Sequence, residues 1–362
     1  MADVAKQAKV HPTTVSLALR NHPSLPERTR SRIQALALKM GYTPDPAWRA
    51  LVEYRMGAKT TKSPVRLAYL THWRSRFGWR DAPAHREFFE GAAGEAKRLG
   101  YEMEHHWLGA RGMTKDRLRS LLNERRISGA LLASHSSEPG REAVFDWTGV
   151  NVVKIDYYPR ACQVHNVTND QRSIIQLAMR RIRQAGYRRI GFVMPVWWDA
   201  FVDSAWSSGF LVEQSLTPVA ERVPILLFEN GDSKRAARPS PQAPEARPVS
   251  AARLREWLDR HQVEVVVSYA PFVEETFAEL GLSIPQDLAY VDIFRTSATA
   301  GAVAGVRQNC ERVGQLAVEI LDRQFRQKQA GVPEVPVTTM VEGTWFDGAS
   351  LPPHASQVAM ST

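Results

Sequence analysis

The chain opens with two stretches that decide its N-terminal fold, DVAKQAKVHPTTVSLALRN at residues 3–21 and ERTRSRIQALALKMGYTPDP at residues 27–46. Apolar residues recur on one face of each of three predicted helices, as helical periodicity requires: Val4, Ala5 and Ala8; Val15, Ala18 and Leu19; Ile33, Leu36, Ala37 and Met40. Residues 9–11 form a short turn, Pro12 suits a first helical position, and Gly41 ends the third helix. Two short helices across a tight turn, braced by a third, predict a helix-turn-helix unit that can place its second helix in a DNA major groove.

The distribution of charge supports this interpretation independently. Residues 1–63 hold 11 Lys and Arg against 4 Asp and Glu, so they carry +7 of the chain's formal net charge of +9. A basic surplus confined to one segment is typical of a phosphate-binding headpiece on a near-neutral body. A solvated basic tail is the alternative, but a tail would lack the apolar period.

Composition limits the class of protein. With 362 residues and 44% hydrophobic content, the chain can bury two or three domain cores. We expect a cytoplasmic protein, because no apolar run approaches the ~18 residues of a membrane helix and no signal peptide precedes Asp3. Cys162 and Cys310 lack metal spacing and are expected to be reduced thiols.

After the headpiece the pattern changes twice. Asp45 and Pro46 predict the start of a short helix that runs to Arg55, and residues 59–64 form a polar linker. From Val65, apolar strands alternate with helices of ten or more residues in two successive series, which predicts parallel, helix-covered sheets. Residues 230–250 interrupt the second series with a Pro-, Ala- and Arg-rich segment, expected to be a surface insertion whose role is open.

The headpiece resembles the LacI/GalR family of bacterial transcription regulators. Core segments such as FFEGAAGEAKRLGY, IRQAGYRRIGFV and VRQNCERVGQLAVEIL share this resemblance, which spans about residues 3–351. It implies an all-α helix-turn-helix headpiece at 1–45 and a hinge helix and linker at 46–63. These join an α/β core of two doubly wound parallel-sheet subdomains, similar to type I periplasmic-binding proteins, at 64–351, before a tail at 352–362. We expect an N-subdomain of about 64–162 plus 293–324 and a C-subdomain of about 163–292 plus 325–346.

The resemblance also implies a homodimeric repressor on double-stranded operator DNA, controlled by a small molecule for which a sugar is one candidate. The expected DNA-binding residues are His11, Pro12, Thr13, Thr14, Leu17, Arg20, Asn21, Arg49 and Leu51. Leu17 suits thymine methyl groups, and Leu51 falls where relatives wedge a leucine between base pairs, although it could simply pack a helix pair. His11 stands where the family has a capping Ser. Lys9 replaces a turn Gly, at a cost of about 1 kcal/mol if that site is left-handed.

The expected effector pocket departs from the family pattern. No Arg precedes the Gly209–Phe210 pair, where Trp206 or Ser207 stands instead. The expected effector-binding residues are His72, Trp73, Asp170, Trp197, Trp198, Trp206, Tyr269, Phe294 and Gln308, with Asp199 as a further polar group. The aromatic members of this set fall at expected strand ends that face the cleft. Their faces would stack on sugar C–H surfaces, while some of these tryptophans could equally be core residues. Arg74, Arg76 and Arg307 are the cations expected near the rim, so a strongly anionic ligand is not expected.

Two other classes of function were weighed. An enzyme is not expected, because the chain holds no P-loop, GxSxG or HExxH motif, and His105 and His106 alternate across a strand. No catalytic residue, metal or cofactor is therefore predicted. A solute-binding sensor that does not act on DNA remains the alternative, and a salt-titrated DNA-binding assay separates it from a regulator.

Overall fold

The computed structural model describes residues 2–19, 24–40, 65–73, 75–135, 147–158, 162–229, 248–295, 301–327, 329 and 331–354. The chain divides into two units between Ser63 and Pro64. The hinge helix predicted at 46–55, with Arg49 and Leu51, lies outside the described residues, as do Arg20, Asn21 and most of the 230–250 insertion. None of the described helices is both long and apolar enough to span a membrane.

The first unit holds the three predicted helices, α1 (Ala2–Ala8), α2 (Pro12–Leu19) and α3 (Glu27–Lys39). The predicted inward faces meet in one core formed by Val4, Ala5, Ala8, Val15, Ala18, Ile33 and Ala37. Met40, expected on the same face as Ile33, is instead 39% exposed beyond the end of α3. Two side chains of α3 donate hydrogen bonds to the backbones of the other two helices. Arg32 donates to the carbonyl of Ala8 in α1 at 3.3 Å, and Gln34 donates to the carbonyl of Ala18 in α2 at 2.8 Å.

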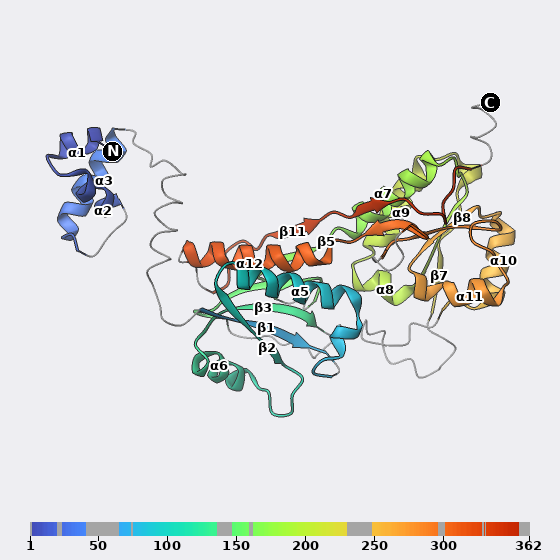
Figure 1. The fold of residues 1–362 in the computed structure, drawn as a ribbon, viewed down its shortest axis with the longest axis horizontal. Helices are drawn as coiled ribbons and strands as arrows, with labels where there is room; N and C mark the ends of the chain where they lie inside the picture. The colour runs from blue at the N-terminus through green and yellow to red at the C-terminus, as the bar shows by residue number, and fades with distance from the viewer. Residues whose placement is uncertain are drawn as a thin grey trace. The chain divides into compact units, whose positions relative to one another are not determined.

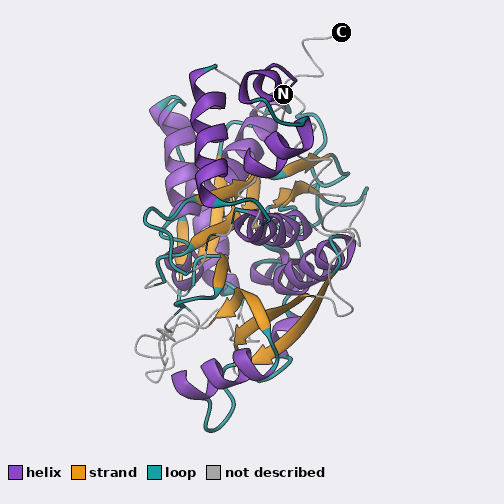
Figure 2. Cartoon of the chain, turned by 90° about the vertical axis from the view of Figure 1, so that its left-hand side faces the viewer, coloured by secondary structure: helices purple, strands orange, loops and turns teal. Residues whose placement is uncertain are grey.

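The second unit contains two six-stranded sheets with helices on both faces, which Figures 1 and 2 show from two directions. The first sheet has the order β11-β5-β4-β3-β1-β2 and the second β12-β10-β9-β8-β6-β7. Every pairing between the described strands is parallel except that of β10 with β12. The first sheet consists of β1 (Val65–His72), β2 (Tyr101–Trp107), β3 (Ile127–His135), β4 (Asn151–Ile155), β5 (His165–Asn169) and β11 (Thr338–Val341). The second consists of β6 (Ile190–Pro195), β7 (Leu226–Phe228), β8 (Val265–Ser268), β9 (Ala289–Asp292), β10 (Ala304–Arg307) and β12 (Thr344–Phe346).

Helices cover the first sheet unequally. On one face, α5 (Pro83–Arg98) and α12 (Cys310–Arg326) lie side by side (Figure 1), and α6 (Lys115–Glu124) covers the other face. Glycines allow α5 and α12 to touch: a Cβ on Gly91 would lie 1.9 Å from the carbonyl oxygen of Glu311, and one on Gly314 2.1 Å from that of Phe88. The two backbones therefore meet without intervening side chains.

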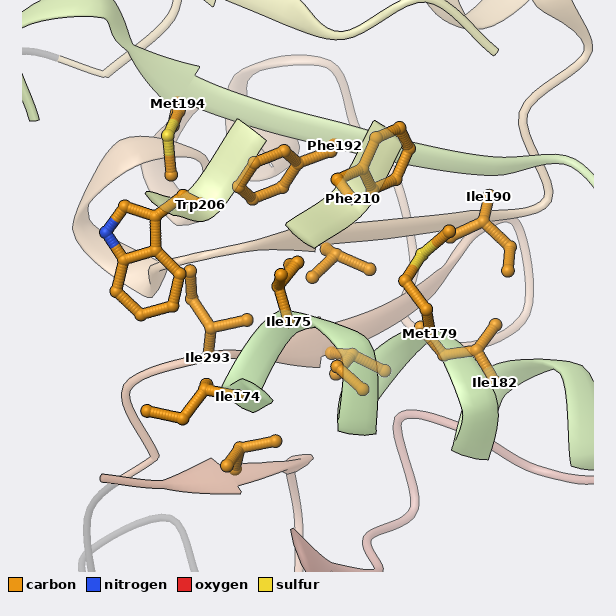
Figure 3. Close-up of a cluster of buried hydrophobic side chains, with 14 of the residues drawn as sticks. Ile174, Ile175, Met179, Ile182, Ile190, Phe192, Met194, Trp206, Phe210 and Ile293 are labelled. Atoms are coloured by element: carbon orange, nitrogen blue, oxygen red, sulfur yellow. The ribbon is translucent and has the colours of Figure 1, made fainter. Parts of the chain in front are cut away.

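The second sheet is covered by α7 (Gln171–Gln184) and α9 (Ala205–Ser215) on one face, and by α10 (Ala251–His261) and α11 (Glu274–Glu279) on the other. Short turns α8 (Val196–Phe201), η1 (Gly78–Asp81), η2 (Val219–Glu221) and η3 (Ala270–Phe272) complete the described elements. Figure 3 shows the core under α7, where Ile175 and Met179 face Phe192 of β6 and Phe210 of α9. The predicted α7 begins as expected, since the Asp170 carboxylate accepts the amide of Ser173 at 3.0 Å.

The sheets correct the expected subdomain limits. β5 and β11 belong to the first sheet, although the residues that contain them, within 163–292 and 325–346, were expected in the C-subdomain. β10 belongs to the second sheet, although residues 293–324 were expected in the N-subdomain. The chain therefore crosses between the sheets after Asn169, after Arg307 and after Val341. Hydrogen bonds join these crossings: the amide of Asp170 donates to the carbonyl of Val341 at 2.9 Å, and the side chain of Asn309 to that of Glu342 at 2.8 Å.

Candidate functional site

The headpiece presents one exposed helix end. His11, Pro12 and Thr13 at the start of α2 are exposed, and Thr14 and Leu17 are half-buried. His11 replaces the expected capping serine in function, because its Nδ1 accepts the amide of Thr13 at 3.3 Å and lies 2.9 Å from the Thr13 hydroxyl. Lys9 has φ of 53°, so the turn does require the left-handed conformation in which a lysine is strained.

In the core, a cavity of about 510 Å³ lies at the carboxyl ends of strands from both sheets. Seven of the nine predicted effector residues line it: Trp73, Trp197, Trp198, Trp206, Tyr269, Phe294 and Gln308. Trp73 follows β1, Tyr269 follows β8 and Phe294 lies just beyond β9, which places these three at strand ends as expected. Ligands of open α/β sheets bind outside the carboxyl ends of strands, so this position is favourable.

Aromatic rings form most of one wall. The Trp198 ring lies 5.4 Å from Tyr269, 4.7 Å from Phe272 and 6.3 Å from Phe294, measured between centroids. Trp198 is half-buried and faces the cavity, whereas Trp206, 5.7 Å from Trp198, is almost fully buried. Trp206 therefore lies behind the wall.

Trp206 was expected at a strand end but belongs to α9, and it packs into the core beside Met194 and Ile293 (Figure 3). Its indole nitrogen points away from Phe192 and Phe210 and has no hydrogen-bond partner among the described residues, and the same holds for the indole nitrogen of Trp197. Both interpretations of these tryptophans apply in part, since Trp206 is a core residue that also reaches the cavity.

The opposite wall comes from the first sheet and α5. Trp73 contacts His85 edge to face at 4.7 Å, and the Nδ1 of His85 lies 3.0 Å from the Ser134 hydroxyl. Burial lowers the pKa of His85 to about 4, so this imidazole is neutral near pH 7. Asp156 follows β4 with φ of 74° and is 9% exposed. Burial raises the pKa of its carboxyl to about 6, while the amide of Tyr157 and the charge of Lys154 act in the opposite direction.

The polar groups expected to hold a ligand are mostly engaged elsewhere. Asp170 caps α7, Asp199 accepts the amide of Ser207 at 3.0 Å, and neither lines the cavity; nor does His72. Arg76 and Arg307 do not line it either, and Arg74 lies outside the described residues. The cavity's polar lining instead includes Asp81, His85, Asp156, Asn169 and Gln171, none of which is among the residues predicted from the sequence.

Only one of these missed residues had a usable signal. Asp156 directly follows the apolar strand NVVKI, and an acidic residue at the carboxyl end of a parallel strand is a reasonable ligand candidate. His85 and Gln171 lie within helices and had no such signal.

The described residues thus form a basic helix-turn-helix headpiece and a separate α/β unit in which two sheets enclose a cavity. Residues 1–45 match the family model described as bacterial regulatory proteins, lacI family. The headpiece is therefore similar to the DNA-binding segment of that family.

Comparisons with individual proteins agree with this family. A curated relative from Streptomyces limosus, an uncharacterized HTH-type transcriptional regulator in the aml 5' region, is 27% identical over 201 residues. That match covers 54% of this chain, which spans about half (52%) of the relative.

Solved structures of low sequence identity share the fold. The transcriptional regulator CelR–cellobiose complex matches with a TM-score of 0.52 at 18% identity, over 96% of this chain and 98% of that one. The Lac repressor dimer bound to operator and the anti-inducer ONPF matches with a TM-score of 0.52 at 14% identity, over 97% and 98%. A regulator from Enterococcus faecium with bound ribose matches with a TM-score of 0.54 at 14% identity, over 80% and 99%.

Proposed function

We propose that this protein is a sequence-specific DNA-binding transcription regulator, most simply a repressor, whose DNA affinity is set by a small molecule bound in the core cavity. The observation that carries the proposal is the pairing of a basic headpiece, whose α2 start is exposed, with a 510 Å³ cavity between two sheets. In this role the protein acts in the cytoplasm as a homodimer on a pseudo-palindromic operator and is not an enzyme.

The crossings suggest how the two sites communicate. Because three adjacent chain segments connect the two sheets and are hydrogen-bonded to one another, the subdomains can rotate about them as about a hinge. A ligand that contacts both walls of the cavity favours one relative orientation. That preference is passed to the 46–63 segment, which joins the core to the headpiece, and so changes DNA affinity.

A carbohydrate-like effector is the proposed ligand class within this function. Support comes from the aromatic wall, since flat rings pack well against sugar C–H faces. The structural relatives bound to cellobiose and ribose are consistent with it.

The headpiece assignment is tested with purified full-length protein on operator DNA selected from random sequence, and on a scrambled duplex of equal length. Leu17→Ala and Thr13→Ala should weaken operator binding more than binding to the scrambled duplex, because these side chains are assigned to base edges. Arg20→Ala and Arg49→Ala should weaken both equally and flatten the salt dependence, because these cations are assigned to phosphates. Failure to select any preferred sequence would favour the solute-binding sensor instead.

A further inference from the structure

The side-chain amides that line the cavity are held in place by bonds to the protein. Its side-chain amides already serve the protein: Asn169 donates to the carbonyl of Gln308, and Gln308 donates to that of Ile293 at 3.0 Å. The amide oxygen of Gln171 accepts the Tyr157 hydroxyl at 3.1 Å. Each amide nitrogen carries two N–H donors, so these bonds orient the three amides and leave some of their donors for a ligand.

The carboxylates Asp81 and Asp156 are the lining groups with the most unused capacity, and they can only accept when ionised. Asp156 accepts the Thr168 hydroxyl at a long 3.4 Å and the backbone amide of Tyr157, which leaves part of its acceptor capacity unused. Asp81 is exposed at the rim and pairs with no described cation. The indole N–H groups of Trp197 and Trp206 are unused donors, but both nitrogens are covered by neighbouring atoms and are not on the cavity surface.

The charge of the cavity is one-sided. Among the described residues, no Lys or Arg lines it. Lys154 is the nearest cation to act on Asp156, but its ammonium group donates to the carbonyl of Tyr157 at 3.1 Å and does not reach the cavity. Within the described part of the chain, the lining thus combines two carboxylates with an aromatic wall and includes no balancing cation.

Aromatic faces and carboxylates together are the groups that recognise organic ammonium ions, because the ring faces carry negative potential and the carboxylate supplies a full charge. We propose that the ligand of this cavity is an organic cation, whose ammonium nitrogen lies against Asp156 and whose carbon substituents pack on Trp198, Tyr269 and Phe294. The proposal rests on the proposed function in taking this cavity as the effector site, and it narrows the carbohydrate class given there to amino sugars or replaces it with an alkylammonium compound. An alkylammonium compound and an amino sugar share this chemistry.

The test compares cations with neutral partners of the same shape, using the full-length protein, calorimetry and tryptophan fluorescence. Choline is paired with 3,3-dimethyl-1-butanol, in which carbon replaces the charged nitrogen, and glucosamine is paired with glucose. We expect the cation of at least one pair to bind with a Kd about tenfold or more below that of its neutral partner, as one well-placed charge allows. The winning pair distinguishes an alkylammonium ligand from an amino sugar.

Variants assign the charge preference to a residue. Asp156→Asn keeps the shape and tolerates the left-handed backbone, and it should reduce the cation preference to near unity; Asp81→Asn should reduce it less. Asp203→Asn is the matched control, because Asp203 also has positive φ but is exposed and outside the cavity lining.

Neutral partners that bind as tightly as the cations in both pairs would overturn the inference, and so would the absence of cation binding up to millimolar concentration. A cation preference that survives Asp156→Asn would overturn the assigned contact. The same preparations are assayed on operator DNA without ligand. Specific DNA binding with no cation preference refutes this inference alone, and loss of specific DNA binding refutes the proposed function.

Discussion

The contact between α5 and α12 offers a sharp test of the core packing. A methyl group added by Gly91→Ala would lie 1.9 Å from the carbonyl oxygen of Glu311, whereas ordinary contacts begin near 3.4 Å. Backbone cannot rotate away as a side chain can, so the helices must separate by roughly 1.5 Å or distort locally. We expect the clash to cost about 3 kcal/mol and the net loss to be about 2 kcal/mol, because alanine gains ~1 kcal/mol over glycine in a helix.

Gly94→Ala is the matched control for this substitution. Gly94 lies in the same helix, but a Cβ there would meet nothing within 4 Å, so only the helix propensity should act. The control should therefore gain about 1 kcal/mol. Gly314→Ala probes the same contact from α12, through a clash at 2.1 Å with the carbonyl oxygen of Phe88. Once the helices have separated, the second methyl group costs less, so the double variant should be less destabilised than the sum.

The assay is urea unfolding followed by tryptophan fluorescence, which reports the core because nine of the ten tryptophans lie beyond residue 64. A Gly91→Ala protein as stable as the parent would show that the helices do not meet at these glycines. Equal changes for Gly91→Ala and Gly94→Ala would show that helix propensity alone is being measured.

Two further predictions concern buried carboxylates. Burial raises the pKa of Asp156 in the folded protein from 3.8 to about 6, so ionisation of this carboxyl lowers the stability of the protein as the pH rises from about 4 to 6. In urea titrations, Asp156→Asn should therefore be more stable than the parent by up to about 3 kcal/mol at pH 8 and equal to it below pH 4. A pH-independent difference between the two proteins would contradict this. Glu213 is 6% exposed and forms ion pairs with Arg183 at 3.1 Å and Arg180 at 3.2 Å. Glu213→Gln should therefore lower the stability by about 2 kcal/mol. A melting temperature equal to that of the parent would refute the cost assigned to these ion pairs.

The elements with strong periodic signals could be predicted from the sequence. The three headpiece helices, β1 and the Asp170 cap of α7 all have local causes, namely an apolar face, an apolar run and a capping side chain. The short strands β5 (HNVTN), β11 (TTMV) and β12 (TWF) carry no such signal, because polar residues fill positions that only sheet partners make favourable. The limits of the subdomains were misplaced for this reason, since β5 and β11 mark the crossings.

The cavity was predictable in its aromatic residues but not in its polar ones. A large aromatic side chain that directly follows an apolar strand, such as Tyr269 after β8, is expected to line the cavity at the strand ends. Polar side chains have competing local uses that the sequence does not reveal. Asp170 and Asp199 were predicted as ligand groups because of their residue type. In the structure Asp170 accepts the backbone amide of Ser173, three residues later, and Asp199 accepts that of Ser207, eight residues later.

The order in which the elements of the first sheet occur along the chain affects how the protein folds during its synthesis. Its central strands β1, β3 and β4 leave the ribosome early, but α12 and β11 follow only after residue 310. Until then one face of the half-built sheet lacks the helix that packs beside α5, and Leu131, Val153 and Val167 have no cover on that side. The headpiece can fold first from local contacts, while the nascent core must keep an apolar surface shielded for most of its synthesis. The growing chain therefore has a long window in which a holding chaperone would be useful.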